Sequence, residues 1–182
     1  MLGVAVLALC VAASLAQSPS FGGCPTVPSQ KTFDVNKYLG FWYEIYLFPT
    51  HFEKGKCTRA KYTLKDNGHV EVYNRDLQDG TEVRAIGDLY RPDAAHPANL
   101  KVRFAAGTPY GSYNVIDTDY GNYTLIYSCE SILGVAHIEF AWILARNMTL
   151  EQSTTDRLMT ELQGYGVDVT KFHKSDQVGC PQ

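Results

Sequence analysis

Cysteine is the residue type in this sequence with the widest chemical potential, as a nucleophile, a metal ligand or a cross-link. The chain of 182 residues contains five cysteines, and Cys10 lies in an uncharged apolar run at residues 1–16. Such a run, ending in small residues, is typical of a signal peptide that is removed on secretion. The remaining four are an even number in an oxidising compartment, so we expect two disulfides and no free thiol for catalysis. They are Cys24, Cys57, Cys129 and Cys180, and their spacing leaves all three pairings open.

The other candidate groups predict neither a metal site nor an enzyme. The histidines are scattered and show no metal-ligand spacing such as H-E-x-x-H; they are His51, His69, His96, His137 and His173. Nothing in the order of serine, histidine and aspartate residues points to a hydrolase. We therefore expect a protein that is not an enzyme, holds no metal and requires no cofactor.

Charge and hydropathy limit the partners and the location. The formal net charge is −3 and no cluster of Lys and Arg is present, so neither nucleic acid nor an anionic membrane is an expected partner. No segment reaches the ~20 apolar residues that cross a bilayer. Residues 17–182 are expected to form one secreted, extracellular domain. Sequons at Asn122 and Asn147 predict N-glycosylation. The oligomeric state stays open.

The elements that would position any site are short strands. Segments with alternating polarity are separated by turn signals, among them Asn67-Gly68 and Asp79-Gly80, which are strong hairpin signals. Eight strands at hairpin spacing, with no helix between them, indicate an all-β fold, an antiparallel sandwich or barrel. Eight strands close well into a barrel with a side-chain-lined interior, so we expect an antiparallel up-and-down barrel. The expected strands are 42–48, 58–64, 69–77, 81–91, 98–104, 112–118, 122–129 and 136–145.

One segment, residues 149–166, has helical period. Thr149 and Gln152 have the spacing of a capping box, and Leu158 and Leu162 lie four residues apart on one face. We expect a C-terminal helix that packs its apolar stripe against the outside of the barrel.

Alternation within the strands predicts a lined interior. Leu100, Val102 and Phe104 share one face of their strand. Five of the 12 tyrosines also fall in strands, namely Tyr62, Tyr73, Tyr113, Tyr123 and Tyr127. This pattern favours an apolar cavity that carries hydroxyl groups, with simple packing as the alternative interpretation.

Three motifs in order resemble the lipocalin family. Gly40-Phe41-Trp42-Tyr43 is similar to the G-x-W motif of the first strand, and Thr118-Asp119-Tyr120 to the T-D-Y motif before the seventh. Arg146 falls where the family keeps an arginine after the eighth strand. The resemblance covers the whole mature chain. It extends to the subfamily of apolipoprotein D and the insect bilin-binding proteins through the stretches FDVNKYLGFWYEI, TDYGNYTLIYSC, FAWILARN and DQVGCP.

This resemblance implies a fold in which Trp42 closes the bottom of the barrel and the Arg146 guanidinium lies over its ring. Gly40 would let the backbone enter the barrel tightly. The motif residues are thus expected to hold the fold rather than touch a ligand. The same resemblance implies the pairings Cys24–Cys129 and Cys57–Cys180.

The resemblance also implies a ligand cup at the open end of the barrel. Its lining would include Tyr62, Asn74, Asp76, Phe104, Tyr113 and Trp142. The leading hypothesis is a secreted lipocalin that binds and transports a lipid, fatty acid or steroid. The alternative is a pigment-binding protein that carries a bilin or a carotenoid. A third hypothesis, a module that binds partners through its loops, is left open by the sequence.

Overall fold

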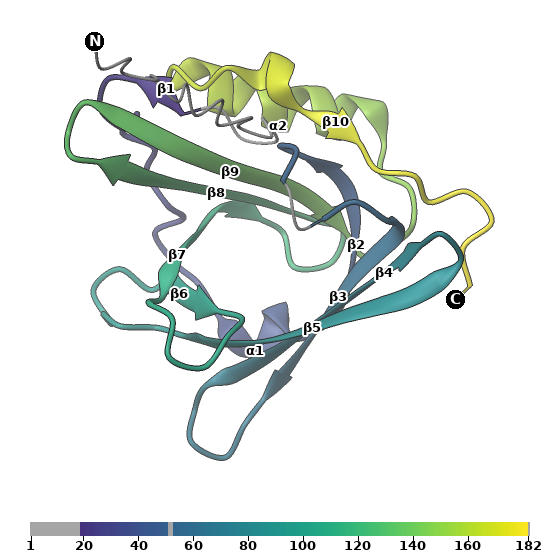
Figure 1. The fold of residues 1–182 in the computed structure, drawn as a ribbon. Coiled ribbons are helices and arrows are strands. Elements are labelled where there is room, and N and C mark those ends of the chain that lie inside the picture. Colours follow the sequence, from purple (N-terminus) through teal and green to yellow (C-terminus); the bar gives the residue numbers. More distant parts are fainter. Residues whose placement is uncertain (1–18, 51–52, 182) are drawn as a thin grey trace, which may run out of the picture.

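Eight long antiparallel strands form the framework of the molecule. The computed structural model describes residues 19–50 and 53–181, so the predicted signal peptide at residues 1–16 lies outside the described residues. Consecutive strands pair with one another, and β9 also pairs with β2, which closes the sheet into a barrel (Figure 1). The predicted eight-stranded barrel is confirmed. Its strands are β2 (Gly40–Leu47), β3 (Lys56–Leu64), β4 (Val70–Gln78), β5 (Thr81–Tyr90), β6 (Asn99–Arg103), β7 (Gly111–Thr118), β8 (Tyr123–Ile132) and β9 (Ala136–Ala145).

Several smaller elements were not expected from the sequence. The helix α1 (Val35–Tyr38) precedes β2, and the Asp34 side chain caps it by accepting a hydrogen bond from the Asn36 N–H at 3.0 Å. The strand β1 (Ser20–Phe21) pairs with β9, and β10 (His173–Lys174) pairs with β2. The 3₁₀ turn η1 (Val169–Lys171) leads into β10. These short elements have no repeating pattern long enough to stand out in a sequence.

The sheet carries two apolar clusters, one on each of its faces. The inner cluster fills the closed part of the barrel and includes Trp42, Val72 and Leu100. The outer cluster lies between the sheet and the C-terminal helix α2 (Gln152–Gly164), where Leu158 and Leu162 meet Ile143. Figure 1 shows this helix outside the barrel wall, as expected. Strand alternation explains both clusters, because successive side chains point to opposite faces.

The two ends of α2 are formed differently. The predicted capping box is wrong, because the N-cap is Glu151 and no side chain caps the helix there. Thr149 lies two residues before that cap, out of capping register. The C-terminus closes with a Schellman motif: Gly166, with φ of +84°, donates to the Gln163 carbonyl at 2.9 Å.

The bottom of the barrel is closed by Trp42 and Arg146. The Trp42 side chain is fully buried, and its indole N–H donates to the Tyr38 carbonyl of α1 at 2.8 Å. The Arg146 guanidinium lies 3.7 Å from the centre of a Trp42 ring and donates to three backbone carbonyls, those of Tyr120, Phe41 and Lys37. Gly40 has a φ of +94°, which a side chain rarely adopts. These contacts fix the closed end.

The Thr118–Tyr120 segment ties the same end to the N-terminal segment. The Asp119 carboxylate accepts hydrogen bonds from the N–H groups of Gly121, Asn122 and Tyr123 at 2.7–3.1 Å, which shapes the β7–β8 turn. The Tyr120 hydroxyl accepts a hydrogen bond from the Asp34 N–H at 3.1 Å. The motif residues therefore support the backbone, and they lie away from the open end.

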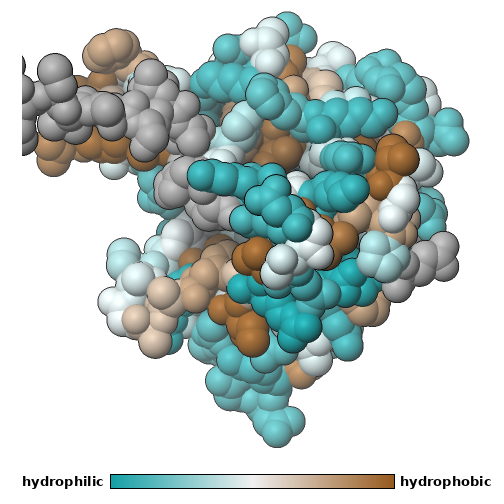
Figure 2. Space-filling view, turned by 45° about the vertical axis from the view of Figure 1, so that its right-hand side comes forward, coloured by the Kyte–Doolittle hydropathy of each residue, from teal (hydrophilic) through white to brown (hydrophobic). Residues whose placement is uncertain are grey.

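Two disulfides fasten the terminal segments to the barrel. One joins Cys24 to Cys129 on β8, and the other joins Cys57 on β3 to Cys180 in the C-terminal tail. The tail also donates from the Ser175 N–H to the Ile45 carbonyl at 2.9 Å. Among the described residues, no helix is long and apolar enough to cross a membrane. The face of the molecule in Figure 2 is mostly hydrophilic, with apolar side chains in small groups.

Candidate ligand-binding cup

A cavity of about 470 Å³ occupies the barrel above Trp42. This volume lies within the usual range for small-molecule sites. Its lining residues outside the strands are Glu53, Phe104, Thr108 and Pro109, and we call the end of the barrel where they lie the mouth. All six residues predicted to line a cup border this one cavity, namely Tyr62, Asn74, Asp76, Phe104, Tyr113 and Trp142. The structure therefore brings together residues from four strands and one loop, although direct ligand contact stays a prediction.

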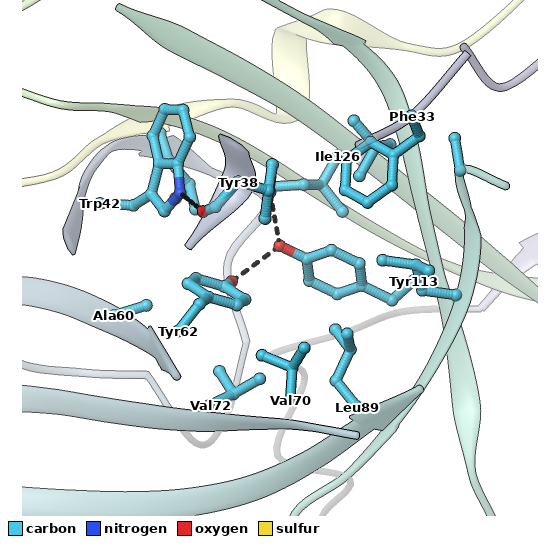
Figure 3. Packing of buried hydrophobic residues seen from close by; sticks show 14 residues of the cluster. Phe33, Tyr38, Trp42, Ala60, Tyr62, Val70, Val72, Leu89, Tyr113 and Ile126 are labelled. Atoms are coloured by element: carbon cyan, nitrogen blue, oxygen red, sulfur yellow. Dashed lines mark hydrogen bonds between the residues drawn. The ribbon is translucent and has the colours of Figure 1, made fainter. Parts of the chain in front are cut away.

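Tyrosine side chains form the floor of the cup. The Tyr113 hydroxyl lies 2.7 Å from that of Tyr62 and 2.9 Å from that of Tyr38 (Figure 3). Tyr38 also hydrogen-bonds to Thr124 at 3.2 Å. Burial raises the pKa of Tyr38 to about 12, and it raises the pKa of Tyr62 well above its usual value. The floor is thus neutral at physiological pH, and its hydroxyls are already paired with one another.

Aromatic rings form part of the wall near the mouth. Trp142 stacks with Phe140 on the same strand, with ring centres 6.0 Å apart. Phe104 covers the backbone of Gly87, where an added Cβ would lie 2.7 Å from the ring, and it remains 44% exposed. A half-exposed phenylalanine beside an apolar cavity is suited to cover a bound ligand.

Three carboxyl groups border the same cavity. Glu44 comes from β2, Glu53 from the 48–55 loop and Asp76 from β4. In the strand register, Trp42 pairs with Ala60, and Ala60 pairs with Asn74. Glu44 and Asp76 follow Trp42 and Asn74 by two residues on their strands, so they point to the same inner face of the barrel but lie nearer the mouth. The pairing of β2 with β9 shifts register between Glu44 and Tyr46.

Each carboxyl group has a defined hydrogen-bond partner. The Glu44 carboxyl accepts from the Ser175 hydroxyl at 2.7 Å, and that of Glu53 accepts from the Trp142 indole N–H at 3.0 Å. Asp76 accepts from the Gly55 N–H and from the Gln78 side chain, both at 3.0 Å. Glu53 and Gly55, which lie between β2 and β3, are therefore anchored to β9 and to β4.

Burial perturbs two of these acids strongly. Burial, followed by repulsion from Glu53, raises the pKa of Glu44 to about 8. Burial also raises the pKa of Glu53 to about 7, and the Asp76 charge acts in the same direction. Near neutral pH, the cup therefore holds acids that exchange protons readily in response to a nearby charge.

Asn74 and Asp76 face the cavity as the resemblance implied. Asp76 is only 7% exposed, so it is part of the wall rather than of a solvated rim. The Asn74 Oδ1 atom is buried and has no hydrogen-bond partner among the described residues. An unpaired buried acceptor is costly, so this atom is suited to meet a donor of a ligand or a water molecule.

Sequence reasoning missed Glu44, Glu53 and Tyr38. Glu44 could have been found, because it shares the inward face of its strand with Trp42, two residues away. Glu53 lies in a loop, where no periodic signal exists. The described residues contain no group of three or more His, Cys, Asp or Glu arranged to hold a metal ion.

A closed barrel with an apolar cup defines the class of small-ligand-binding β-barrel proteins. The Lipocalin-like domain family model matches residues 33–177. Apolipoprotein D of Cavia porcellus is 43% identical over 182 residues, with 100% of this chain and 96% of the relative covered.

Solved structures show the same fold. Insecticyanin of the tobacco hornworm Manduca sexta has a TM-score of 0.76 and 30% identity, with 89% of this chain and 91% of that chain covered. Lobster apocrustacyanin A1 has a TM-score of 0.77 and 26% identity, with 90% and 93% covered. This chain belongs to the lipocalin family, and it is a lipocalin that binds a small hydrophobic ligand.

Proposed function

We propose that the protein is a secreted carrier of a lipid, fatty acid or steroid, bound in the cup. The observation that carries this proposal is the cavity of about 470 Å³, walled by Trp142, Phe104 and Val102 above a neutral tyrosine floor. Burial of apolar surface in such a cup supplies about 25 cal/mol per Å² of ligand area removed from water. Tyr62, Asn74, Asp76 and Tyr113 complete the proposed contact set.

Secretion and a non-enzymatic role belong to the same proposal. The two disulfides are typical of an oxidising compartment, and they agree with a signal peptide at residues 1–16. All four cysteines of residues 17–182 are joined in disulfides, so none of them supplies a thiol nucleophile.

N-glycosylation is proposed first at Asn147, which is exposed in the loop after β9. The side-chain amide of Asn122 is exposed too, but it donates to the Asp119 carboxylate at 2.7 Å. Glycosidase treatment of Asn147→Gln and Asn122→Gln variants would assign each sequon by its mass shift.

The ligand class is tested on protein purified from its natural source. We expect organic extraction to release a lipid and the protein to lack an absorption band in the visible range. A visible band would instead support the pigment-binding alternative, a bilin or a carotenoid. Release of neither would contradict the carrier proposal.

The contact set is tested with a cavity-filling variant. Ala85 borders the cavity from β5, whereas Thr63 is an exposed residue of β3 that does not border it. We expect Ala85→Phe to weaken binding of a neutral probe such as dodecanol, measured by tryptophan fluorescence, and Thr63→Phe to leave it unchanged. Equal binding by both variants would place the ligand elsewhere.

A further inference from the structure

Three carboxyl groups lie among the polar groups that border the cup above its floor. Glu44, Glu53 and Asp76 present carboxyl oxygens from three different parts of the chain. Asn74 adds a buried carbonyl oxygen that no described residue satisfies. A site recognises the chemistry that complements it, so three carboxyl groups and an unpaired carbonyl oxygen on the cavity wall favour a ligand that carries donors.

The described cations do not neutralise these acids. None of the three carboxylates takes part in a salt bridge among the described residues. Four arginines also border the cavity, and each has a partner other than these acids. Arg75 and Arg84 pair with Glu82, and the Arg59 guanidinium lies 5.1 Å from the centre of the Phe41 ring, although the Nε atoms of Arg59 and Arg75 have no hydrogen-bond partner among the described residues. Arg103 lies over the Tyr110 ring at 4.5 Å. His51, two residues before Glu53, lies outside the described residues.

We propose that the ligand of this cup is an amphiphilic amine, with its ammonium group beside Glu44, Glu53 and Asp76 and its apolar body over the tyrosine floor. This inference rests on the proposed function and narrows it to one class of head group. The carboxyl groups come from β2, from the connection between β2 and β3, and from β4. They are therefore spread along one side of the cavity. Asn74 lies two residues before Asp76 on the same inner face of β4, and its unpaired Oδ1 atom is available to a second donor of the ligand.

The electrostatics favour an amine over the other common lipid head groups. An ammonium group close to a buried carboxyl favours its ionised form, which would lower the raised pKa values of Glu44 and Glu53. Binding of the amine should therefore release protons near neutral pH. A fatty-acid carboxylate would oppose the ionisation of Glu44 and Glu53 and would be repelled by whichever of the acids is ionised, and an alcohol would gain one neutral hydrogen bond.

The test compares three probes that differ only in the head group: dodecylamine, dodecanol and dodecanoic acid. Binding to the full disulfide-bonded chain is followed by the change in tryptophan fluorescence, to which Trp42 and Trp142 both contribute. We expect dodecylamine to bind about tenfold more tightly than dodecanol, since a paired charge in a desolvated site is worth more than a neutral hydrogen bond. Dodecanoic acid should bind most weakly of the three.

A matched pair of variants separates the effect of the acids in the cup from the effect of the protein's overall negative charge. Glu53→Gln should abolish most of the preference for the amine, whereas Glu151→Gln, the same change at an exposed helix end, should leave it intact. Near-ultraviolet circular dichroism verifies that both variants fold. Independently, calorimetry of the unmodified chain in two buffers of different ionisation enthalpy should detect proton release with the amine only.

The outcomes distinguish the two proposals. If dodecanol binds and dodecylamine has no advantage, or if dodecanoic acid binds best, the amine inference is overturned while the hydrophobic carrier stands. If none of the three probes binds, both fall. An amine preference that survives Glu53→Gln and Glu44→Gln without proton release would also overturn the inference.

Discussion

The buried carboxyl group of Glu44 makes the stability of this protein depend on pH in an unusual direction. Its side chain is only 4% exposed, and its pKa is raised from 4.5 to about 8 in the folded chain. Between these values the folded state holds a proton that the unfolded state has lost. The unfolding free energy therefore falls as the pH rises through this window, and it levels off above the folded pKa.

The magnitude follows from the pKa. A tenfold change in proton affinity corresponds to about 1.4 kcal/mol, so a rise from 4.5 to about 8 corresponds to at most about 5 kcal/mol. Glu53, whose pKa is raised to about 7, acts in the same direction. The Glu44→Gln variant removes the first contribution, and its amide oxygen can still accept the hydrogen bond from Ser175.

The measurement is urea-induced unfolding with the disulfides intact, at about pH 5 and about pH 9. We expect the original chain to lose several kcal/mol of stability between these conditions, and Glu44→Gln to lose about half as much. Glu151→Gln, a change at an exposed residue, should follow the original chain. If Glu44→Gln and the original chain show the same pH dependence, the reasoning that Glu44 is a buried, protonated acid is wrong.

Three further predictions concern the closed end, the tail and the wall of the cup. Arg146→Lys keeps the charge but loses the planar donor set over Trp42, so thermal unfolding should show a loss of about 2 kcal/mol. Replacing both Cys57 and Cys180 by serine releases a link across 123 positions. The double variant should lose about 2–5 kcal/mol of unfolding free energy, measured with denaturant, and its C-terminal tail should become open to proteolysis. A tail that stays protected would show that the pairing of β10 with β2 is enough to hold it. Trp142→Phe removes the indole donor to Glu53, so probe binding by calorimetry should weaken about threefold to tenfold; unchanged affinity would argue against contact between this ring and the ligand.

The sequence by itself determined the barrel and its closed end. Strand alternation and turn signals are local, and they repeat along the chain, so the eight strands can be recognised without knowing their partners. At Asp79-Gly80, both residues adopt positive φ, 51° and 78°, in the two-residue hairpin that this pair predicts. The lining of the cup followed from the resemblance, because residues at matched strand positions point the same way.

Only the tertiary structure decided the chemistry of the cup. Glu44, Glu53 and Asp76 are not adjacent in sequence. They meet because β3 pairs with both β2 and β4, and because the Gly55 N–H, two residues after Glu53, donates to Asp76. The start of α2 was likewise set by the packing of Leu158 and Leu162 against the barrel rather than by the capping pattern at Thr149. Burial and mutual repulsion are properties of this assembled arrangement, so the raised pKa values of the acids have no counterpart in any one segment of the chain.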